Sequence, residues 1–195
     1  MTKASLRKEF LQKRLALSEA DYAQLNFQLY QIFFSSMDLS FIKVLHTFLP
    51  LQKNKEPDTW IIIDRIRREF PHILLSLPRI DQATGALENI FFEGLHQLEK
   101  NTWGIAEPKQ GVPTPPQQID MVLVPLLACD TNGQRVGYGK GFYDKFLVTC
   151  RPDCITVGIS FFEPVEPIDD VNAFDVPLQY CLTPTTLHRF RQTSF

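Results

Sequence analysis

A ten-residue stretch of the chain combines the side-chain types best suited to bind a phosphorylated ligand. Its residues are Arg135, Val136, Gly137, Tyr138, Gly139, Lys140, Gly141, Phe142, Tyr143 and Asp144. The two cations can supply charge to phosphate oxygens, and the glycines permit positive φ and close backbone approach. An acid beside a nucleotide suits magnesium, which is usually held by one or two carboxylates together with the phosphates. The stretch therefore predicts an anion site with an accompanying metal ion.

The flanking residues predict how this stretch is positioned. Residues 121–124 form an apolar, β-branched run that ends at Pro125, which is typical of a strand buried on both faces. Phe142, Phe146 and Leu147 have helical spacing, so we expect a helix to begin near Lys140. A glycine-rich loop between a strand and a helix presents unpaired backbone N–H groups to an anion.

Three familiar nucleotide- or RNA-binding motifs do not match this stretch. A dinucleotide fingerprint needs glycine where Phe142 stands, and no Gly-Lys-Ser/Thr sequence ends a phosphate loop. Residues 140–146 begin like an RNA-recognition signature, but Tyr143 replaces its small residue and Asp144 its second aromatic. A glycine turn shaped only for packing is the alternative interpretation.

Length and charge favour one domain that binds small ligands. The 195 residues allow a single domain, 1–195, and no change in composition suggests a boundary. With 20 basic and 22 acidic side chains, the chain has no overall basic field to attract nucleic acid. No apolar run approaches the length of a membrane span, and the four cysteines form no metal-binding or disulfide pattern. We expect a monomeric, cytoplasmic protein with reduced thiols.

Two helices are expected at the amino end. Leu6, Phe10, Leu11 and Leu15 mark the apolar face of the first helix, with the basic residues Lys3, Arg7, Lys8, Lys13 and Arg14 mostly off that face. Lys3 and Arg7 are four residues apart and would lie together, either binding an anion or forming a solvated basic face. Ser18 followed by Asp21 predicts the N-cap of a second helix that extends to about Phe34.

The remaining segments predict an α/β fold. Strands are expected over residues 42–49, 73–77, 89–92, 155–159 and 181–183, and a helix carrying Ile62, Ile66 and Phe70 follows Glu56. This alternation favours a three-layer α/β sandwich with a largely parallel central sheet and helices on both faces. Ligands bind at the carboxyl ends of such strands, so we expect loops 49–59 and 135–144 to share that edge.

The glycine-rich stretch also resembles a known family. Val124, Pro125, Asp130 and Gly133 followed by residues 135–144 are similar to the signature of the 5-formyltetrahydrofolate cyclo-ligases, also called methenyltetrahydrofolate synthetases. The resemblance covers nearly the whole chain in the right order. It includes residues 3–7, the stretch from Phe48 to Thr59, Trp103 to Pro108, and residues 175–178.

The resemblance implies a reaction and a role for each matching residue. Family members use ATP and Mg²⁺ to close the ring of 5-formyltetrahydrofolate, which gives 5,10-methenyltetrahydrofolate, ADP and phosphate. The resemblance assigns Lys140, Arg135 and Tyr143 to catalysis, and Asp144 and Asp175 to the metal. ATP would contact Lys3, Arg7, Arg135, Val136, Gly137, Tyr138, Gly139, Lys140, Gly141, Phe142 and Tyr143. The reduced folate would contact Arg7, Leu49, Glu56, Trp103, Tyr138, Gly139, Lys140, Gly141 and Phe142.

Single residues in these sets have structural explanations as well. Glu56 suits the start of the following helix electrostatically, and a lone Trp103 is most often hydrophobic core. Three positions depart from the family pattern: Pro57, Leu126 in place of a glycine, and Gln179 in place of an acid. They motivate one alternative, a catalytically silent relative that binds folate or nucleotide. An RNA-binding module built on residues 140–146 is the other alternative.

Overall fold

A mixed seven-stranded sheet forms the centre of the protein. The structure, a computed structural model, describes residues 1–190 apart from 82–83, 85, 102–103 and 105. The strand order is β11-β10-β9-β6-β1-β2-β3, and the central strands from β10 to β2 run parallel. The edge strands β3 and β11 are antiparallel to their neighbours. The strands of this sheet are β1 (Val44–His46), β2 (Leu74–Ile80), β3 (Leu87–Phe91), β6 (Met121–Pro125), β9 (Ile155–Ile159), β10 (Tyr180–Leu182) and β11 (Leu187–Arg189).

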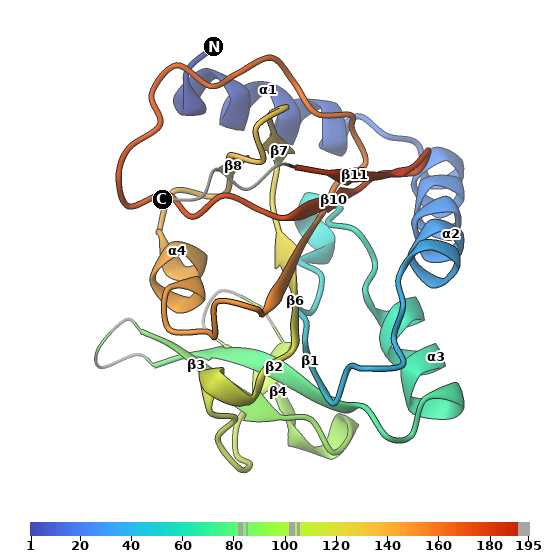
Figure 1. Ribbon diagram of the computed structural model, residues 1–195. Coiled ribbons are helices and arrows are strands. Elements are labelled where there is room, and N and C mark those ends of the chain that lie inside the picture. Colours follow the sequence, from blue (N-terminus) through green and yellow to red (C-terminus); the bar gives the residue numbers. More distant parts are fainter. Residues whose placement is uncertain (82–83, 85, 102–103, 105, 191–195) are drawn as a thin grey trace.

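Helices cover both faces of the sheet, as the sequence predicted. They are α1 (Lys3–Leu15), α2 (Glu19–Ser36), α3 (Trp60–Glu69) and α4 (Phe142–Leu147). In Figure 1, α2 and α3 lie to the right of β6 and α4 lies to its left. Alternate residues of β6 enter two cores: Met121 and Leu123 face α2 and α3, whereas Val122 and Val124 face α4. Burial on both faces therefore explains the unbroken apolar run of this strand.

Short elements complete the chain. Two small two-stranded sheets pair β4 (Leu98–Lys100) with β5 (Ala106–Pro108), and β7 (Ala128–Cys129) with β8 (Arg135–Val136). Single 3₁₀ turns are η1 (Gln52–Asn54), η2 (Leu95–Gln97) and η3 (Pro116–Gln118). Within the described ranges, no helix is long and apolar enough to cross a bilayer.

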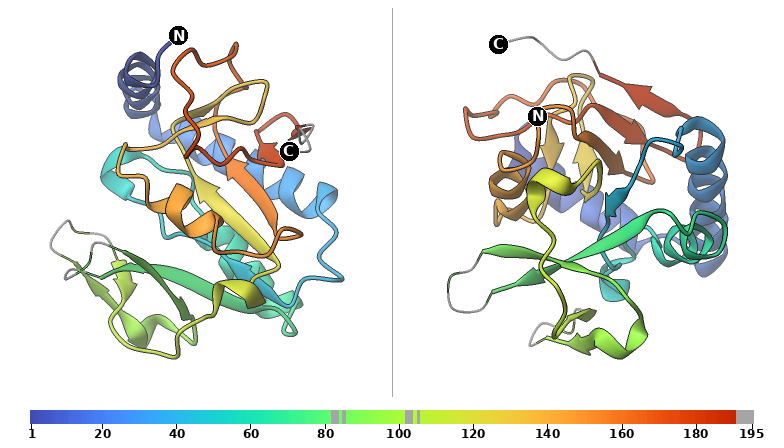
Figure 2. Two further views of the ribbon diagram at one scale, coloured as in Figure 1. Left: turned by 60° about the vertical axis from the view of Figure 1, so that its left-hand side comes forward. Right: turned by 60° about the horizontal axis from the view of Figure 1, so that its bottom comes forward.

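Helix α1 lies across the end of the sheet toward which β6 points (Figures 1 and 2). Leu6 and Phe10 pack against Leu127, Ala128 and Val136 of the β7–β8 region. Two expectations for this helix were wrong. Leu15 was expected on the apolar face but is 45% exposed, while Arg14 was expected off that face and is 2% exposed. Arg14 follows Phe10 by four residues, so it lies on the inward side, where its guanidinium meets loop carbonyls.

The second helix confirms the predicted cap. Ser18 is the N-cap of α2, and its hydroxyl accepts a hydrogen bond from the Asp21 N–H. The four cysteines are free thiols. Cys129, Cys154 and Cys181 are buried, and Cys150 is half-buried.

His46, at the end of β1, is fully buried against α4. Its ring centroid lies 4.8 Å from that of Phe146, and its Nε2 lies 3.5 Å from the Tyr143 hydroxyl. Its Nδ1 has no hydrogen-bond partner within the described part of the chain. Burial lowers the pKa of His46 to about 3, because the charged imidazolium is penalised away from water.

This depressed pKa predicts a pH dependence of stability. Between pH 6.5 and about 3 the unfolded chain takes up a proton at position 46 and the folded protein does not. The contribution of His46 to the free energy of unfolding is therefore fully present above pH 6.5. Below pH 6.5 it is lost by roughly 1 kcal/mol per pH unit. We expect His46→Gln to remove that part of the slope in urea unfolding between pH 7 and pH 5. His72→Gln, at an exposed histidine, is the matched control, and equal slopes in the wild type and His46→Gln would contradict the prediction.

Candidate active site

Helix α1 directs three cations toward the carboxyl edge of the sheet. Lys3, Arg7 and Arg14 follow one another at spacings of four and seven residues, so they lie along one side of the helix. The Lys3 ammonium pairs with Asp175, and Arg7 Nε donates to the Gly137 carbonyl at 2.8 Å. Arg14 donates to the Tyr138 hydroxyl. All three cations therefore touch the glycine turn or the loop beside it.

The turn of residues 137–141 connects β8 to α4. Gly139 and Gly141 have φ values of +89° and +67°, which side-chain-bearing residues rarely adopt. A Cβ at Gly139 would lie 3.4 Å from the Arg7 guanidinium carbon, whereas one at Gly137 or Gly141 would meet nothing within 4 Å. The turn is thus closed against α1 on one side and open on the other.

The predicted order of strand, glycine loop and helix is confirmed, with two differences. The β7–β8 hairpin intervenes after β6, and buried Asp130 shapes its turn by accepting hydrogen bonds from the Asn132 and Gln134 N–H groups, both at 2.9 Å. Helix α4 begins at Phe142 and has only six residues. Its dipole is correspondingly small, so the positive charge at this edge comes mainly from the cations of α1 and the turn.

Arg135 and Asp144 form a largely buried ion pair. Arg135 Nη2 lies 2.6 Å from Asp144 Oδ1, and the Arg135 side chain is 6% exposed. Arg135 also donates to the Val176 carbonyl, while the Val176 N–H donates to Asp144 at 3.1 Å. Burial lowers the pKa of Arg135, and the nearby charges of Asp144 and Asp175 oppose that shift. This arrangement ties α4, β8 and the 170–176 loop together.

The two predicted metal carboxylates, Asp144 and Asp175, are linked through the 170–176 loop. Val176, which bonds to Asp144, directly follows Asp175, and Asp175 pairs with Lys3. Among the described residues there is no cluster of three or more His, Cys, Asp or Glu side chains that fits a metal. Two carboxylates suit Mg²⁺ by donor type, provided that phosphate oxygens and water complete its octahedral shell.

Glu56 and Tyr138 join the other predicted loop to the glycine turn. Glu56 is 5% exposed, and it accepts hydrogen bonds from the Tyr138 hydroxyl and from the Leu51 N–H, both at 2.7 Å. Burial raises the pKa of Glu56, while these two hydrogen bonds and Arg14 oppose the shift. Leu49 is 6% exposed and packs in the core beneath this loop.

The remaining predicted residues occupy different environments. Lys140 is exposed and makes no hydrogen bond or ion pair with the described protein. Val136 is buried and Phe142 half-buried, whereas the Tyr143 ring packs against His46 and Phe146. Trp103 lies outside the described residues. Residues 142–147 are helical, so the aromatic side chains that motivated the RNA-binding alternative do not lie on a sheet as that module requires.

The three departures from the family pattern are accommodated locally. Pro57 is buried and leaves Glu56 in contact with Tyr138. The Leu126 side chain packs against Gly158: a Cβ added at Gly158 would lie only 2.5 Å from Leu126 Cδ2. The Gln179 side chain donates to the Cys154 carbonyl at 3.1 Å. None of them interrupts the contacts among α1, the glycine turn and Glu56.

Sequence reasoning missed Arg14 and Asn54. Arg14 contacts Tyr138, and Asn54 donates to the same hydroxyl at 3.2 Å. The available signal was the seven-residue spacing from Arg7 to Arg14, which places both on one side of a helix. Asn54 carried no comparable signal.

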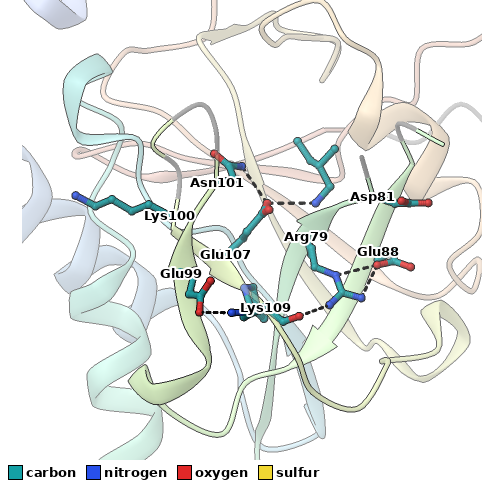
Figure 3. Close-up of a pocket in the computed structure, with 10 residues that line it drawn as sticks. Arg79, Asp81, Glu88, Glu99, Lys100, Asn101, Glu107 and Lys109 are labelled. Carbon is teal, nitrogen blue, oxygen red and sulfur yellow. Dashed lines mark hydrogen bonds and ion pairs between the residues drawn. The ribbon is translucent and has the colours of Figure 1, made fainter. Parts of the chain in front are cut away.

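A separate cleft of about 500 Å³ lies between the β2–β3 and β4–β5 hairpins (Figure 3). Its walls carry paired charges: Arg79 lies 2.6 Å from Glu88, and Lys109 lies 2.7 Å from Glu99. Glu107 accepts a hydrogen bond from Asn101 at 3.1 Å. None of the predicted site residues in the described part of the chain lines this cleft.

Comparison with known proteins identifies relatives over nearly the whole chain. Residues 1–184 match the model of the 5-formyltetrahydrofolate cyclo-ligase family. A 5-formyltetrahydrofolate cyclo-ligase of Mycoplasma pneumoniae is 27% identical over 83% of this chain and 86% of its own length. That of Mus musculus is 26% identical over 92% of each chain.

A solved structure shows the same fold. The 5,10-methenyltetrahydrofolate synthetase of Aquifex aeolicus superposes with a TM-score of 0.83 at 26% identity, covering 100% of this chain and 96% of the other. The match of the family model over nearly the full length, together with the shared fold, shows that the chain belongs to the 5-formyltetrahydrofolate cyclo-ligase family.

Proposed function

We propose that this enzyme closes the ring of 5-formyltetrahydrofolate at the expense of ATP and releases 5,10-methenyltetrahydrofolate, ADP and phosphate. The observation that supports the proposal most directly is the position of the glycine turn. Cations of α1 meet the turn on one side, and Glu56 contacts Tyr138 of the same turn. A phosphate-binding surface and a polar group for a second substrate therefore share one edge of the sheet.

The chemistry follows from the substrate. A formamide oxygen is a poor leaving group, and transfer of the γ-phosphoryl group to that oxygen converts it to a phosphate ester that departs readily. The folate N10 then attacks the formyl carbon, the N10 proton is lost to solvent, and the C–O bond to phosphate breaks, which leaves the closed five-membered ring and free phosphate. Phosphoryl transfer depends mainly on positioning and charge neutralisation, so no side-chain nucleophile is required.

Lys3, Arg7 and Lys140 are the cations we assign to the phosphates. Arg7 uses only Nε on the protein, and its other donors make no hydrogen bond to the described residues. Lys140 is exposed beside the open side of the turn. Arg135, in contrast, is held by Asp144 and Val176, so we assign it to orienting the Asp144 carboxylate.

Mg²⁺, when bound, neutralises charge on the transferred phosphoryl group. Asp144 and Asp175 would hold it, and both now pair with cations, Arg135 and Lys3. In a metal-nucleotide complex, a phosphate would replace Asp175 as the partner of Lys3, and the metal ion would replace Lys3 as the partner of Asp175. This exchange leaves no carboxylate or ammonium unpaired, which favours the metal-nucleotide complex over either component alone.

The proposal is tested by mixing the protein with 5-formyltetrahydrofolate and Mg-ATP and recording the absorbance of the methenyl product. Growth of that absorbance with stoichiometric release of ADP supports the proposed reaction. A catalytically silent relative would bind 5-formyltetrahydrofolate without forming the chromophore, and that result would refute the assignment.

Lys140→Ala should raise the KM for ATP by roughly tenfold or more, because a hydrogen bond to a charged group contributes about 1.5–3 kcal/mol. The KM for the folate should change much less. Lys145→Ala, at an exposed lysine within α4, is the matched control. An unchanged KM for ATP in steady-state kinetics would show that Lys140 does not bind the phosphates.

Asp144→Asn should abolish turnover and weaken the dependence of nucleotide affinity on Mg²⁺. It should also destabilise the fold by roughly 1–3 kcal/mol, because Arg135 loses its ionised partner. Folded fraction is therefore measured by circular dichroism alongside nucleotide titrations with and without Mg²⁺. Asp153→Asn, at a carboxylate that is 77% exposed, serves as control. Near-normal turnover of folded Asp144→Asn would exclude its metal role.

A further inference from the structure

Arg14 is a buried cation whose donors reach three separate segments. It is 2% exposed, and its Nε donates to the Asn54 carbonyl at 2.7 Å. Nη1 donates to the Leu126 carbonyl at 3.2 Å, and Nη2 donates to the Tyr138 hydroxyl. These partners belong to η1, to the segment after β6 and to the glycine turn. One side chain of α1 thus joins three segments that meet at the carboxyl edge of the sheet.

The contacts of the Tyr138 hydroxyl fix the direction of its proton. The hydroxyl oxygen accepts hydrogen bonds from Arg14 and from Asn54 Nδ2 at 3.2 Å. Arginine and amide NH₂ groups are donors, so the hydroxyl hydrogen is left to donate to Glu56 Oε1 at 2.7 Å. The second Glu56 oxygen accepts from the Leu51 N–H at 2.7 Å. Both oxygens of this buried carboxylate are therefore oriented.

The charges of Arg14 and Glu56 compensate each other through the phenol. A buried carboxylate and a buried guanidinium are each costly unless paired or fully hydrogen-bonded. The Tyr138 hydroxyl contacts both Arg14 and Glu56 and links them. The backbone of loop 51–56 is fixed as well, because Arg14 donates to the Asn54 carbonyl and Glu56 accepts from the Leu51 N–H.

We propose that Arg14 is a positioning residue for the folate side of the site: it orients Tyr138, and through Tyr138 it orients Glu56 and loop 51–56 against the glycine turn. The inference rests on the proposed function for its folate half. It differs from a general role in folding because the atoms that Arg14 contacts, the Asn54 and Leu126 carbonyls and the Tyr138 hydroxyl, belong to loops at the carboxyl edge of the sheet. Of these three residues, only Leu126 also sends its side chain into a flanking core.

The link between the loops is tested without any ligand. Hydrogen–deuterium exchange is compared among the wild type, Arg14→Met, Tyr138→Phe and Lys13→Met. Lys13 is the matched control because it neighbours Arg14 on α1, with a side chain that is 51% exposed. Arg14→Met and Tyr138→Phe should accelerate exchange of the Leu51 amide and of residues 137–141 at least tenfold, while strands β6 and β9 remain protected.

The folate half is tested by calorimetric titration with 5-formyltetrahydrofolate in the absence of nucleotide. Arg14→Met and Tyr138→Phe should each weaken its binding about tenfold, and the double variant should be no weaker than the stronger single effect. Affinity for Mg-ADP should fall less than affinity for the folate, because Lys3, Arg7 and Lys140 are retained while the turn of residues 137–141 is loosened. Lys13→Met should match the wild type in both titrations.

The outcomes separate the two halves of the inference. Wild-type exchange rates at Leu51 and residues 137–141 in both variants would overturn the positioning role. Faster exchange with unchanged folate affinity, or additive losses in the double variant, would overturn its connection to the folate. If Arg14→Met does not fold, Tyr138→Phe decides the question, since it removes only the hydroxyl. If the wild type binds no reduced folate, the proposed function and the folate half both fail, and exchange alone decides the link.

Discussion

The attachment of α1 to the glycine turn is the interaction on which the rest of the site depends. Arg7 contacts the Gly137 carbonyl and Arg14 the Tyr138 hydroxyl, while Lys3 pairs with Asp175 in the loop beside the turn. Leu6 and Phe10, one helical turn away from these cations, hold the helix on the β7–β8 region. The first helix of the chain is thereby joined to a glycine turn and a carboxylate, Asp175, that lie more than a hundred residues later.

Charge balance shapes this edge of the sheet. Arg135 is paired with Asp144 and Lys3 with Asp175, and Arg14 is linked to Glu56 by a phenol. Each of these three cations therefore has an anionic counterpart in a region with little access to water, where an unpaired charge would be costly. The balance also orients side chains, because each carboxylate accepts backbone N–H groups as well: Val176 for Asp144, Leu51 for Glu56 and Asn172 for Asp175.

The sequence predicted the parts of the structure that local patterns determine. The apolar run of β6 predicted a strand buried on both faces, and Ser18 with Asp21 predicted the start of α2. The alternation of elements predicted the largely parallel sheet, and loops 49–59 and 135–144 meet as expected through Glu56 and Tyr138. What escaped prediction depends on tertiary contacts. A charged side chain such as Arg14 is expected at the surface, and only its contacts with Asn54, Leu126 and Tyr138 explain its burial.

The inward orientation of Arg135 was equally hidden, since its partners Asp144 and Val176 lie nine and 41 positions along the chain. The central claim remains that the turn of residues 137–141 holds the phosphates of ATP against α1. A crystal structure with Mg²⁺ and a non-hydrolysable ATP analogue tests it most directly. The account predicts phosphate oxygens within hydrogen-bond distance of Lys3, Arg7 and the turn. A nucleotide bound elsewhere, such as in the cleft lined by Arg79 and Lys109, would contradict it.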